Sequence, residues 1–130
     1  MRTSTLLLSA LMACLGSAFT AGVAQAQVAA QKAPPAYFIS EFEVTDPEAL
    51  KPYREHVEAT FKPFGGRFVV RGGQIAPLEG DAPEGRFVVI EFDNMEKAQA
   101  WYESSAYGKL KPIRHAAAKS RVFILEGLAN

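Results

Sequence analysis

The sequence predicts an α+β fold in which one antiparallel sheet carries helices on a single face. Strand-like segments occur at 37–44, 67–71, 86–92 and 121–126, one helical segment follows the first strand, and a second helical region precedes the last strand. This order, β-α-β-β-α-β, is that of the split-βαβ or ferredoxin-like arrangement. We therefore expect one domain over residues 36–128.

The first helix begins at Asp46-Pro47, because Asp is a preferred N-cap and Pro is favoured at the first helical position. Its apolar residues recur every three or four positions, as on the buried side of a helix: Leu50, Tyr53, Val57, Phe61 and Phe64. Asp93 or Asn94 caps the second helical region, which contains Met95, Ala98, Trp101 and Tyr102 and then a further piece with Leu110 and Ile113. The segments 67–71 and 86–92 are expected to pair as a hairpin.

Alternation along the strands sorts their side chains into two faces. The apolar face, expected beneath the helices, contains Phe38, Phe42, Val44, Phe68, Val70, Val88, Ile90, Phe92, Val122 and Ile124. The opposite face is amphipathic and contains Tyr37, Ile39, Glu41, Glu43, Arg67, Val69, Arg71, Phe87, Val89, Glu91, Arg121, Phe123 and Leu125. Two helices cannot cover both faces, and a monomer seldom exposes so large an apolar patch, so we expect a homodimer.

The N-terminus has the pattern of a secretory signal peptide, with Arg2, an apolar run and then Ala24-Gln25-Ala26. This predicts a leader over residues 1–26, cleaved after Ala26, and a periplasmic or secreted protein. Residues 27–35 end in two prolines and are predicted to be a flexible linker. The only cysteine, Cys14, lies in the leader; a lipoprotein acylated at Cys14 is the alternative.

The predicted mature chain has no thiol for a disulfide, a nucleophile or a metal. The leader contains one of the 14 basic residues and none of the 14 acidic ones, so the mature domain is nearly neutral. This argues against general binding of nucleic acid or of an anionic membrane. No metal-ligand spacing, phosphate-binding glycine loop or Gly-x-Ser-x-Gly motif occurs, so we expect no metal and no cofactor.

Several stretches together resemble the bacterial family known as domain of unknown function 1330. They are Ala36-Tyr37-Phe38-Ile39, Val44-Thr45-Asp46-Pro47, Gly65-Gly66-Arg67-Phe68, Val70-Arg71-Gly72-Gly73, Val89-Ile90-Glu91-Phe92, Ala100-Trp101-Tyr102, Ser105-Ala106-Tyr107, Pro112-Ile113-Arg114 and Glu126-Gly127. The resemblance implies a dimeric α/β barrel of the ferredoxin-like class. It implies no activity, although proteins of related fold include cofactor-independent monooxygenases, muconolactone isomerases and stress-responsive barrel proteins.

Two pairs of residues are the main candidates for ligand binding. Tyr107 and Arg114 are seven residues apart, so on a helix they face the same side and together could hold an anion. Arg71 and Glu91 belong to neighbouring strands and could polarise or deprotonate a ligand, or else form a cross-strand ion pair. His56 is a candidate general base if it faces a cavity, and otherwise a partly exposed helix residue.

Other features have equally plain structural explanations. The segment 109–121 contains no acidic residue, so it is either an anion-binding surface or a solvated basic face: Lys109, Lys111, Arg114, His115, Lys119 and Arg121. Trp101 and Tyr102 either line an aromatic pocket or fill the core, and helical spacing favours the core for Trp101.

Three functions remain open from the sequence. The first is a dimeric periplasmic protein that binds a small organic molecule or is associated with stress. Its ligand site would contain Arg71, Glu91, Tyr107 and Arg114, of which Tyr107 and Arg114 could hold an anionic group. The second is a cofactor-independent monooxygenase or isomerase acting on an aromatic or lactone-like acid, with Tyr107, Arg114 and either Glu91 or His56 as working residues. The third is a structural oligomeric module.

Overall fold

The computed structural model describes residues 31–129 of the 130-residue chain. The predicted leader, its cleavage site, Cys14 and the first part of the predicted linker lie outside the described residues. The elements in chain order are β1 (Ala36–Val44), α1 (Pro47–Phe61), a 3₁₀ turn (Lys62–Phe64), β2 (Arg67–Arg71), β3 (Arg86–Phe92), α2 (Met95–Glu103), α3 (Ser105–Ala117) and β4 (Ala118–Glu126).

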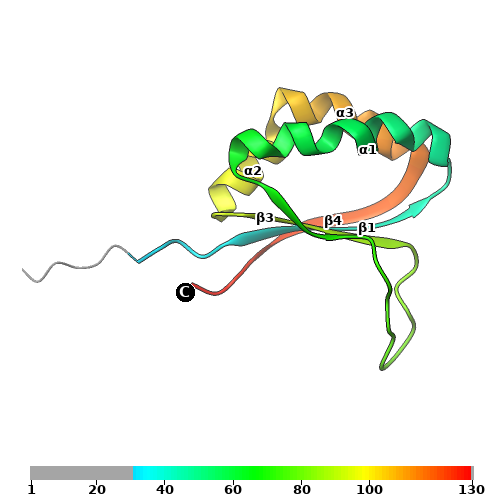
Figure 1. The fold of residues 1–130 in the computed structure, drawn as a ribbon, viewed down its shortest axis with the longest axis horizontal. Helices are drawn as coiled ribbons and strands as arrows, with labels where there is room; N and C mark the ends of the chain where they lie inside the picture. Colours follow the sequence, from blue (N-terminus) through cyan, green and yellow to red (C-terminus); the bar gives the residue numbers. More distant parts are fainter. Residues whose placement is uncertain (1–30, 130) are drawn as a thin grey trace, which may run out of the picture.

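The four strands form one antiparallel sheet in the order β2-β3-β1-β4. Figure 1 shows α1, α2 and α3 above one face of this sheet, and no described helix lies on the other face. The β-α-β-β-α-β order, the β2–β3 pairing and the placement of the helices on one face are confirmed. Asp46 caps α1 as expected, because its carboxylate accepts hydrogen bonds from the backbone N–H groups of Glu48 and Ala49 at 3.1 and 3.0 Å.

The last strand begins at Ala118 and not at Arg121, three residues earlier than its apolar pattern indicates. Residues 118–120 pair with Val44, Glu43 and Phe42 of β1, so the ladder continues directly from the end of α3. Ladder hydrogen bonds set the strand boundary here, because Lys119 and Ser120 carry no apolar signal.

At the end of β2, the side chains lie on the opposite faces of the sheet from those predicted. A β-bulge shifts the register between Phe68 and Val70, so that Val70 pairs with Val89 and Arg71 pairs with Val88. One extra residue in a strand reverses the side of every residue after it. The assignment of Val70 to the helix-covered face and of Arg71 to the open face is therefore wrong: Val70 is 40% exposed, and Arg71 faces the space beneath α1.

Trp101 lies at the centre of the core and is fully buried, as the helical spacing predicts. Its ring packs against those of Phe38, Phe92 and Tyr107, with centroids 5.0, 5.4 and 4.2 Å away. Its indole N–H donates to Thr60 Oγ1 at 3.0 Å, so the one polar atom of the side chain is satisfied. This packing joins α2 and α3 to the sheet.

Gly85, just before β3, fits tightly against β1. Its φ is +92°, and a Cβ there would collide with the Phe42 carbonyl oxygen. Gly80, in the preceding loop, also has a positive φ of +69°, but a Cβ there would meet no atom within 4 Å.

We expect Gly85→Ala to lower the free energy of unfolding by about 1–3 kcal/mol more than Gly80→Ala, because only Gly85 combines backbone strain with overpacking. Urea denaturation of the two variants measures this difference, and equal losses would contradict it.

Candidate functional site

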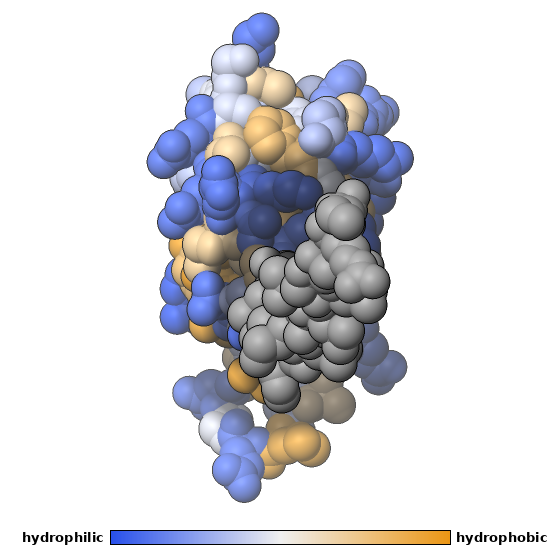
Figure 2. All heavy atoms as spheres, turned by 90° about the vertical axis from the view of Figure 1, so that its left-hand side faces the viewer, coloured by the Kyte–Doolittle hydropathy of each residue, from blue (hydrophilic) through white to orange (hydrophobic). Residues whose placement is uncertain are grey.

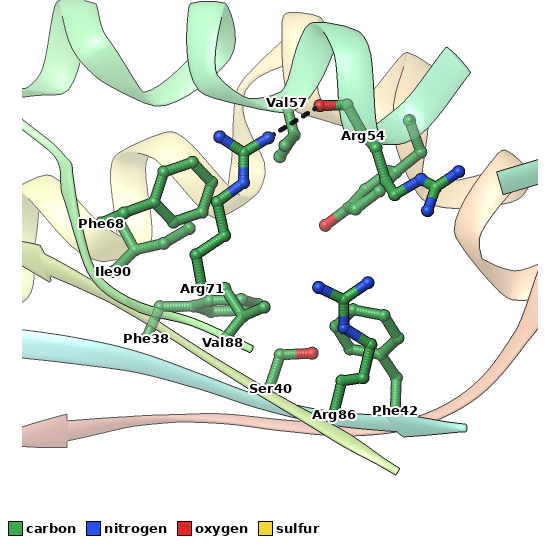
Figure 3. Close-up of a pocket in the computed structure, with 11 residues that line it drawn as sticks. Phe38, Ser40, Phe42, Arg54, Val57, Phe68, Arg71, Arg86, Val88 and Ile90 are labelled. Atoms are coloured by element: carbon green, nitrogen blue, oxygen red, sulfur yellow. Dashed lines mark hydrogen bonds between the residues drawn. The ribbon is translucent and has the colours of Figure 1, made fainter. Parts of the chain in front are cut away.

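A pocket lies between α1 and the half of the sheet formed by β1, β2 and β3 (Figure 3). It is lined by Phe38, Ser40, Phe42, Tyr53, Arg54, Val57, Phe68, Arg71, Arg86, Val88 and Ile90. The enclosed free space is about 50 Å³, enough for a few water molecules. A ligand the size of an aromatic ring therefore enters only when the exposed side chains at the mouth move outward.

The lining follows from the periodicity of each element. Tyr53 and Val57 are one turn apart on α1 and face the sheet. On β1 and β3, alternate residues face the helices, which places Ser40 between Phe38 and Phe42 and puts Arg86 in line with Val88 and Ile90. On β2, Arg71 reaches the pocket only because of the bulge.

Three arginines surround the mouth, and no carboxylate lines it. In Figure 3, Arg71 extends up to α1, Arg86 rises from β3 toward the same space, and Arg54 descends from α1 to one side. Arg71 donates to the Arg54 carbonyl oxygen at 3.4 Å and lies 3.7 Å from the half-exposed Glu58 carboxylate. The mouth is thus positively charged, with Glu58 the only acidic contact among the described residues.

Ser40 is a polar residue on the floor of this pocket, between Phe38 and Phe42 of β1 (Figure 3). It is 2% exposed, and its hydroxyl oxygen has no hydrogen-bond partner within the described chain. Leaving a buried hydroxyl without a partner costs about 1–3 kcal/mol. A ligand with a polar atom at this depth would remove that cost.

Behind the pocket, α1 and α3 meet through two tyrosines. The hydroxyl groups of Tyr53 and Tyr107 are 3.3 Å apart, and both side chains are buried. Next to them lies Arg114, which is 1% exposed and donates to Ser120 Oγ. No carboxylate lies within 4 Å of Arg114 among residues 31–129, and its Nε has no partner there. Arg114 is therefore a buried cation without an ionic partner.

Burial and the positive charge of Arg114 both affect the pKa values of the two tyrosines. Burial raises the pKa of the Tyr53 phenol well above its usual range, and the neighbouring Tyr107 raises it further. Burial also raises the pKa of Tyr107, while the positive charge of Arg114 acts in the opposite direction. Both phenols are consequently neutral at physiological pH and can donate hydrogen bonds.

The structure places Tyr107 and Arg114 side by side, as their spacing predicts. Neither lines the pocket, however, since both are buried behind it, and Tyr53 lies between the pocket and Tyr107. His56 is exposed on α1, with Nδ1 2.8 Å from the Pro52 carbonyl oxygen, and does not line the pocket. Its position agrees with the alternative of an exposed helix residue.

Arg71 and Glu91 lie on opposite faces of the sheet, so the expectation that they share a face is wrong. The bulge turns Arg71 toward α1, and Glu91 instead pairs with Arg67, its direct cross-strand neighbour, at 2.5 Å. A cross-strand ion pair does form at Glu91, with a different arginine. Whether either residue contacts a ligand stays a prediction.

The basic segment is largely occupied by contacts within the chain. Arg121 pairs with Glu41 at 2.6 Å, Lys119 approaches Glu43 at 3.9 Å, and the Lys111 ammonium lies 3.8 Å from the centre of the Tyr102 ring. These contacts favour a solvated basic face over a built anion site.

Four of the five polar lining residues were not among the sequence candidates: Ser40, Tyr53, Arg54 and Arg86. A signal existed for two of them. Ser40 has the strand parity of Phe38 and Phe42, and Arg86 has that of Val88 and Ile90, so both are polar residues at positions facing the core. Polar residues in an apolar stripe are the observation that identifies this pocket.

Residues 31–129 contain no group of three or more His, Cys, Asp or Glu side chains arranged to hold a metal ion. Over the same range, no helix is both long and apolar enough to cross a membrane.

Comparison with known proteins gives a family and a fold. Residues 35–128 match the family described as Domain of unknown function (DUF1330). Among solved structures, the chain is similar to RPA0582 of Rhodopseudomonas palustris, a protein of unknown function, with a TM-score of 0.59 and 18% identity over 78% of this chain and 88% of that one.

It is also similar to SnoaB of Streptomyces nogalater, a cofactor-independent oxygenase, with a TM-score of 0.53 and 13% identity over 75% of this chain and 97% of that one. For HapK of Hahella chejuensis the TM-score is 0.50 and the identity 20%, over 73% and 94% of the two chains. These likenesses confirm the ferredoxin-like fold found in dimeric α/β barrels. No curated protein matches the chain in sequence.

The raised phenol pKa values predict a loss of stability in alkaline solution. Above the ordinary tyrosine pKa near 10, the unfolded chain releases protons that folded Tyr53 and Tyr107 retain. The free energy of unfolding should therefore fall as pH rises above about 10. Tyr53→Phe should make this decline less steep, because one of the two retained protons is then absent. Urea unfolding from pH 8 to 11 measures the slopes, and identical slopes in the two proteins would contradict the prediction.

Proposed function

The chain belongs to the DUF1330 family, whose description assigns no activity, and we propose that it binds a small organic anion in the pocket between α1 and the sheet. The observation that carries this proposal is the combination of an apolar interior with three arginines at the mouth and no carboxylate in the lining. Clustered guanidinium groups repel one another unless an anion lies among them.

The lining indicates the shape of the ligand. Phe38, Phe42, Phe68, Val57, Val88 and Ile90 supply an apolar wall suited to a flat ring or a short hydrocarbon. Guanidinium groups bind carboxylates through paired hydrogen bonds, so the charged end of the ligand would lie at Arg71 and Arg86. A carboxylic acid with an aromatic body satisfies both requirements.

An enzymatic role on the same ligand is the second candidate. Tyr53 lines the pocket and is hydrogen-bonded to Tyr107, so a neutral phenol able to donate a hydrogen bond to developing negative charge already borders the ligand space. The likeness to SnoaB concerns the fold alone at 13% identity. Binding is therefore the primary proposal, and turnover of the bound acid is the extension.

We also propose that two copies of the chain pack through the open face of the sheet. Exposed apolar side chains on this face include Val70, Phe123 and Leu125. The ion pairs Arg67–Glu91 and Arg121–Glu41 already neutralise its charged groups, which lowers the cost of burying them.

The loop between β2 and β3 extends the same surface. It projects below the sheet in Figure 1, on the side away from the helices. Its Leu78 is 92% exposed, and hydrophobic atoms are visible at the lower end of the molecule in Figure 2. A second copy on the open face would lie beside this loop.

Export remains a proposal from the sequence, because residues 1–30 lie outside the described part of the chain. Its support is the leader pattern ending at Ala26. A mature chain beginning at Gln27, identified by its mass after expression in a bacterium with two membranes, is the expected result.

The ligand proposal predicts selective binding of aromatic acids. Benzoate should bind more tightly than benzyl alcohol, and Arg71→Gln should weaken benzoate binding about tenfold, as expected for a lost charged hydrogen bond. Isothermal titration calorimetry measures both affinities.

Arg67→Gln is the matched control for this measurement. Arg67 lies on the same strand and has a similar side-chain exposure, 56% against 53% for Arg71, but it is on the opposite face of the sheet. Its replacement should leave benzoate affinity unchanged. Equal effects of the two substitutions, or no binding of benzoate by the unmodified protein, would refute the proposal.

The dimer predicts a mass in solution twice that of one chain. Phe123→Lys places a charge among the exposed apolar side chains of the open face and should yield monomers at micromolar concentration, because an unpaired buried charge is costly. Ala116→Lys, on the exposed side of α3, should remain dimeric. Light scattering after gel filtration distinguishes the two results, and a monomeric unmodified protein would exclude the dimer.

A further inference from the structure

The deep part of the pocket differs chemically from its mouth. Two hydroxyl groups belong to buried side chains of the lining, those of Ser40 and Tyr53, and the other buried residues of the lining are apolar. The arginines, by contrast, are exposed residues. A ligand that fills the pocket thus meets exposed charged groups at the mouth and two neutral hydroxyls on buried side chains.

The number of donors limits what can bind at the deep end. A carboxylate has two oxygens and about four acceptor positions, so two hydroxyls in an apolar wall would leave it under-satisfied. A single oxygen that carries delocalised charge, as in a phenolate or an enolate, needs fewer donors and loses less solvation on burial. The deep end therefore favours such an oxygen over a second carboxylate.

The groups behind Tyr53 strengthen this preference. Tyr53 is hydrogen-bonded to Tyr107, and the positive charge of Arg114 acts on both phenols. Arg114 is buried without a carboxylate partner in the described chain, so its field is not cancelled locally. When Tyr107 donates to Tyr53, the proton of Tyr53 is free for the ligand, and each donor in the series polarises the next.

We propose that the deep end of the pocket is an oxyanion site for a phenolate or enolate oxygen, with Tyr53 and Ser40 as the donors and with Tyr107 and Arg114 as positioning residues behind Tyr53. The inference rests on the proposed function and names its ligand class. The ligand is an aromatic or enolisable acid whose ionisable hydroxyl lies deep and whose carboxylate faces the arginines. A hydroxybenzoate has this arrangement.

The experiment uses 4-nitrophenol, whose ionised form absorbs visible light and which ionises near neutral pH. Titration of the bound probe reports its pKa directly. The site predicts that binding lowers this pKa and that 4-nitroanisole, which cannot ionise, binds more weakly than the phenolate. Benzoate, measured in parallel, reports on the arginine mouth alone.

Single substitutions test the role of each side chain in binding the phenolate. Tyr53→Phe should weaken phenolate binding by about tenfold or more, since a hydrogen bond to a charged oxygen is lost. Ser40→Ala should weaken it in the same direction with little change in volume. Tyr107→Phe should raise the bound pKa of the probe while leaving 4-nitroanisole affinity unchanged, a shift that a purely structural role would not produce.

Tyr102→Phe is the matched control. The Tyr102 ring also packs on Tyr107, with centroids 5.5 Å apart, but no hydrogen bond joins its hydroxyl to those of Tyr53 and Tyr107. Phenolate affinity and the bound pKa should be unchanged in this variant. If Tyr53→Phe does not fold, as judged by circular dichroism, Ser40→Ala and Tyr107→Phe carry the test.

The outcomes distinguish the two levels of the proposal. Benzoate binding without a lowered probe pKa, or with a lowered pKa that none of the Ser40, Tyr53 and Tyr107 substitutions changes, would overturn the oxyanion site and leave the anion pocket intact. Failure of the unmodified protein to bind either benzoate or 4-nitrophenolate would overturn both.

Discussion

The contact between α1 and α3 at Tyr53 and Tyr107 is the interaction on which the rest of this site depends. α1 packs closely against α3, whereas its backbone approaches the strands much less. Long side chains therefore fill the interval between α1 and the sheet, and where Tyr53 and Val57 do not fill it completely the pocket remains. If α1 lay directly on the strands, the core would be fully packed and no ligand space would exist.

The same contact joins two halves of the domain that differ in the polarity of their buried side chains. On the α2 side, Trp101 and its aromatic neighbours form an apolar cluster with its one N–H satisfied by Thr60. On the α1 side, buried polar groups include Ser40 and Arg114, each with an atom that lacks a hydrogen-bond partner within residues 31–129. The first half provides stability, and the second half contains Ser40, whose hydroxyl a ligand in the pocket could satisfy.

The architecture could be predicted from the sequence because long, regular patterns of apolar residues determine its helices and strands. The helical repeat from Leu50 to Phe61 and the alternation in β1 and β3 identify the elements, their order and the face that the helices cover. The end of β2 could not be predicted in the same way, because a bulge adds one residue without any local signal. Its consequence is large: the same arginine lies either on the open face or in the pocket, depending on that single residue.

The candidate site was predictable only in part for a related reason. Tyr107 and Arg114 were identified as a pair because seven residues are two helical turns, and the structure brings them together. Their burial and their connection to the pocket through Tyr53 depend on how α1 and α3 pack, which no local pattern encodes. Ser40 and Arg86 carried a readable signal, polarity in an apolar stripe, but this signal is meaningful only once the stripe is known to face a cavity.

Arg114 offers the strongest argument that this region is more than a structural module. Replacing a buried ion by an apolar side chain of similar volume is often neutral or stabilising, so stability alone does not explain a charge at this position. The hydrogen bond to Ser120 secures the junction of α3 and β4, but a neutral donor could make it. A neutral residue could not supply a positive charge behind Tyr107 and Tyr53, close to a pocket that contains the unpartnered hydroxyl of Ser40. The buried charge of Arg114 therefore supports the proposed anionic ligand on the other side of Tyr53.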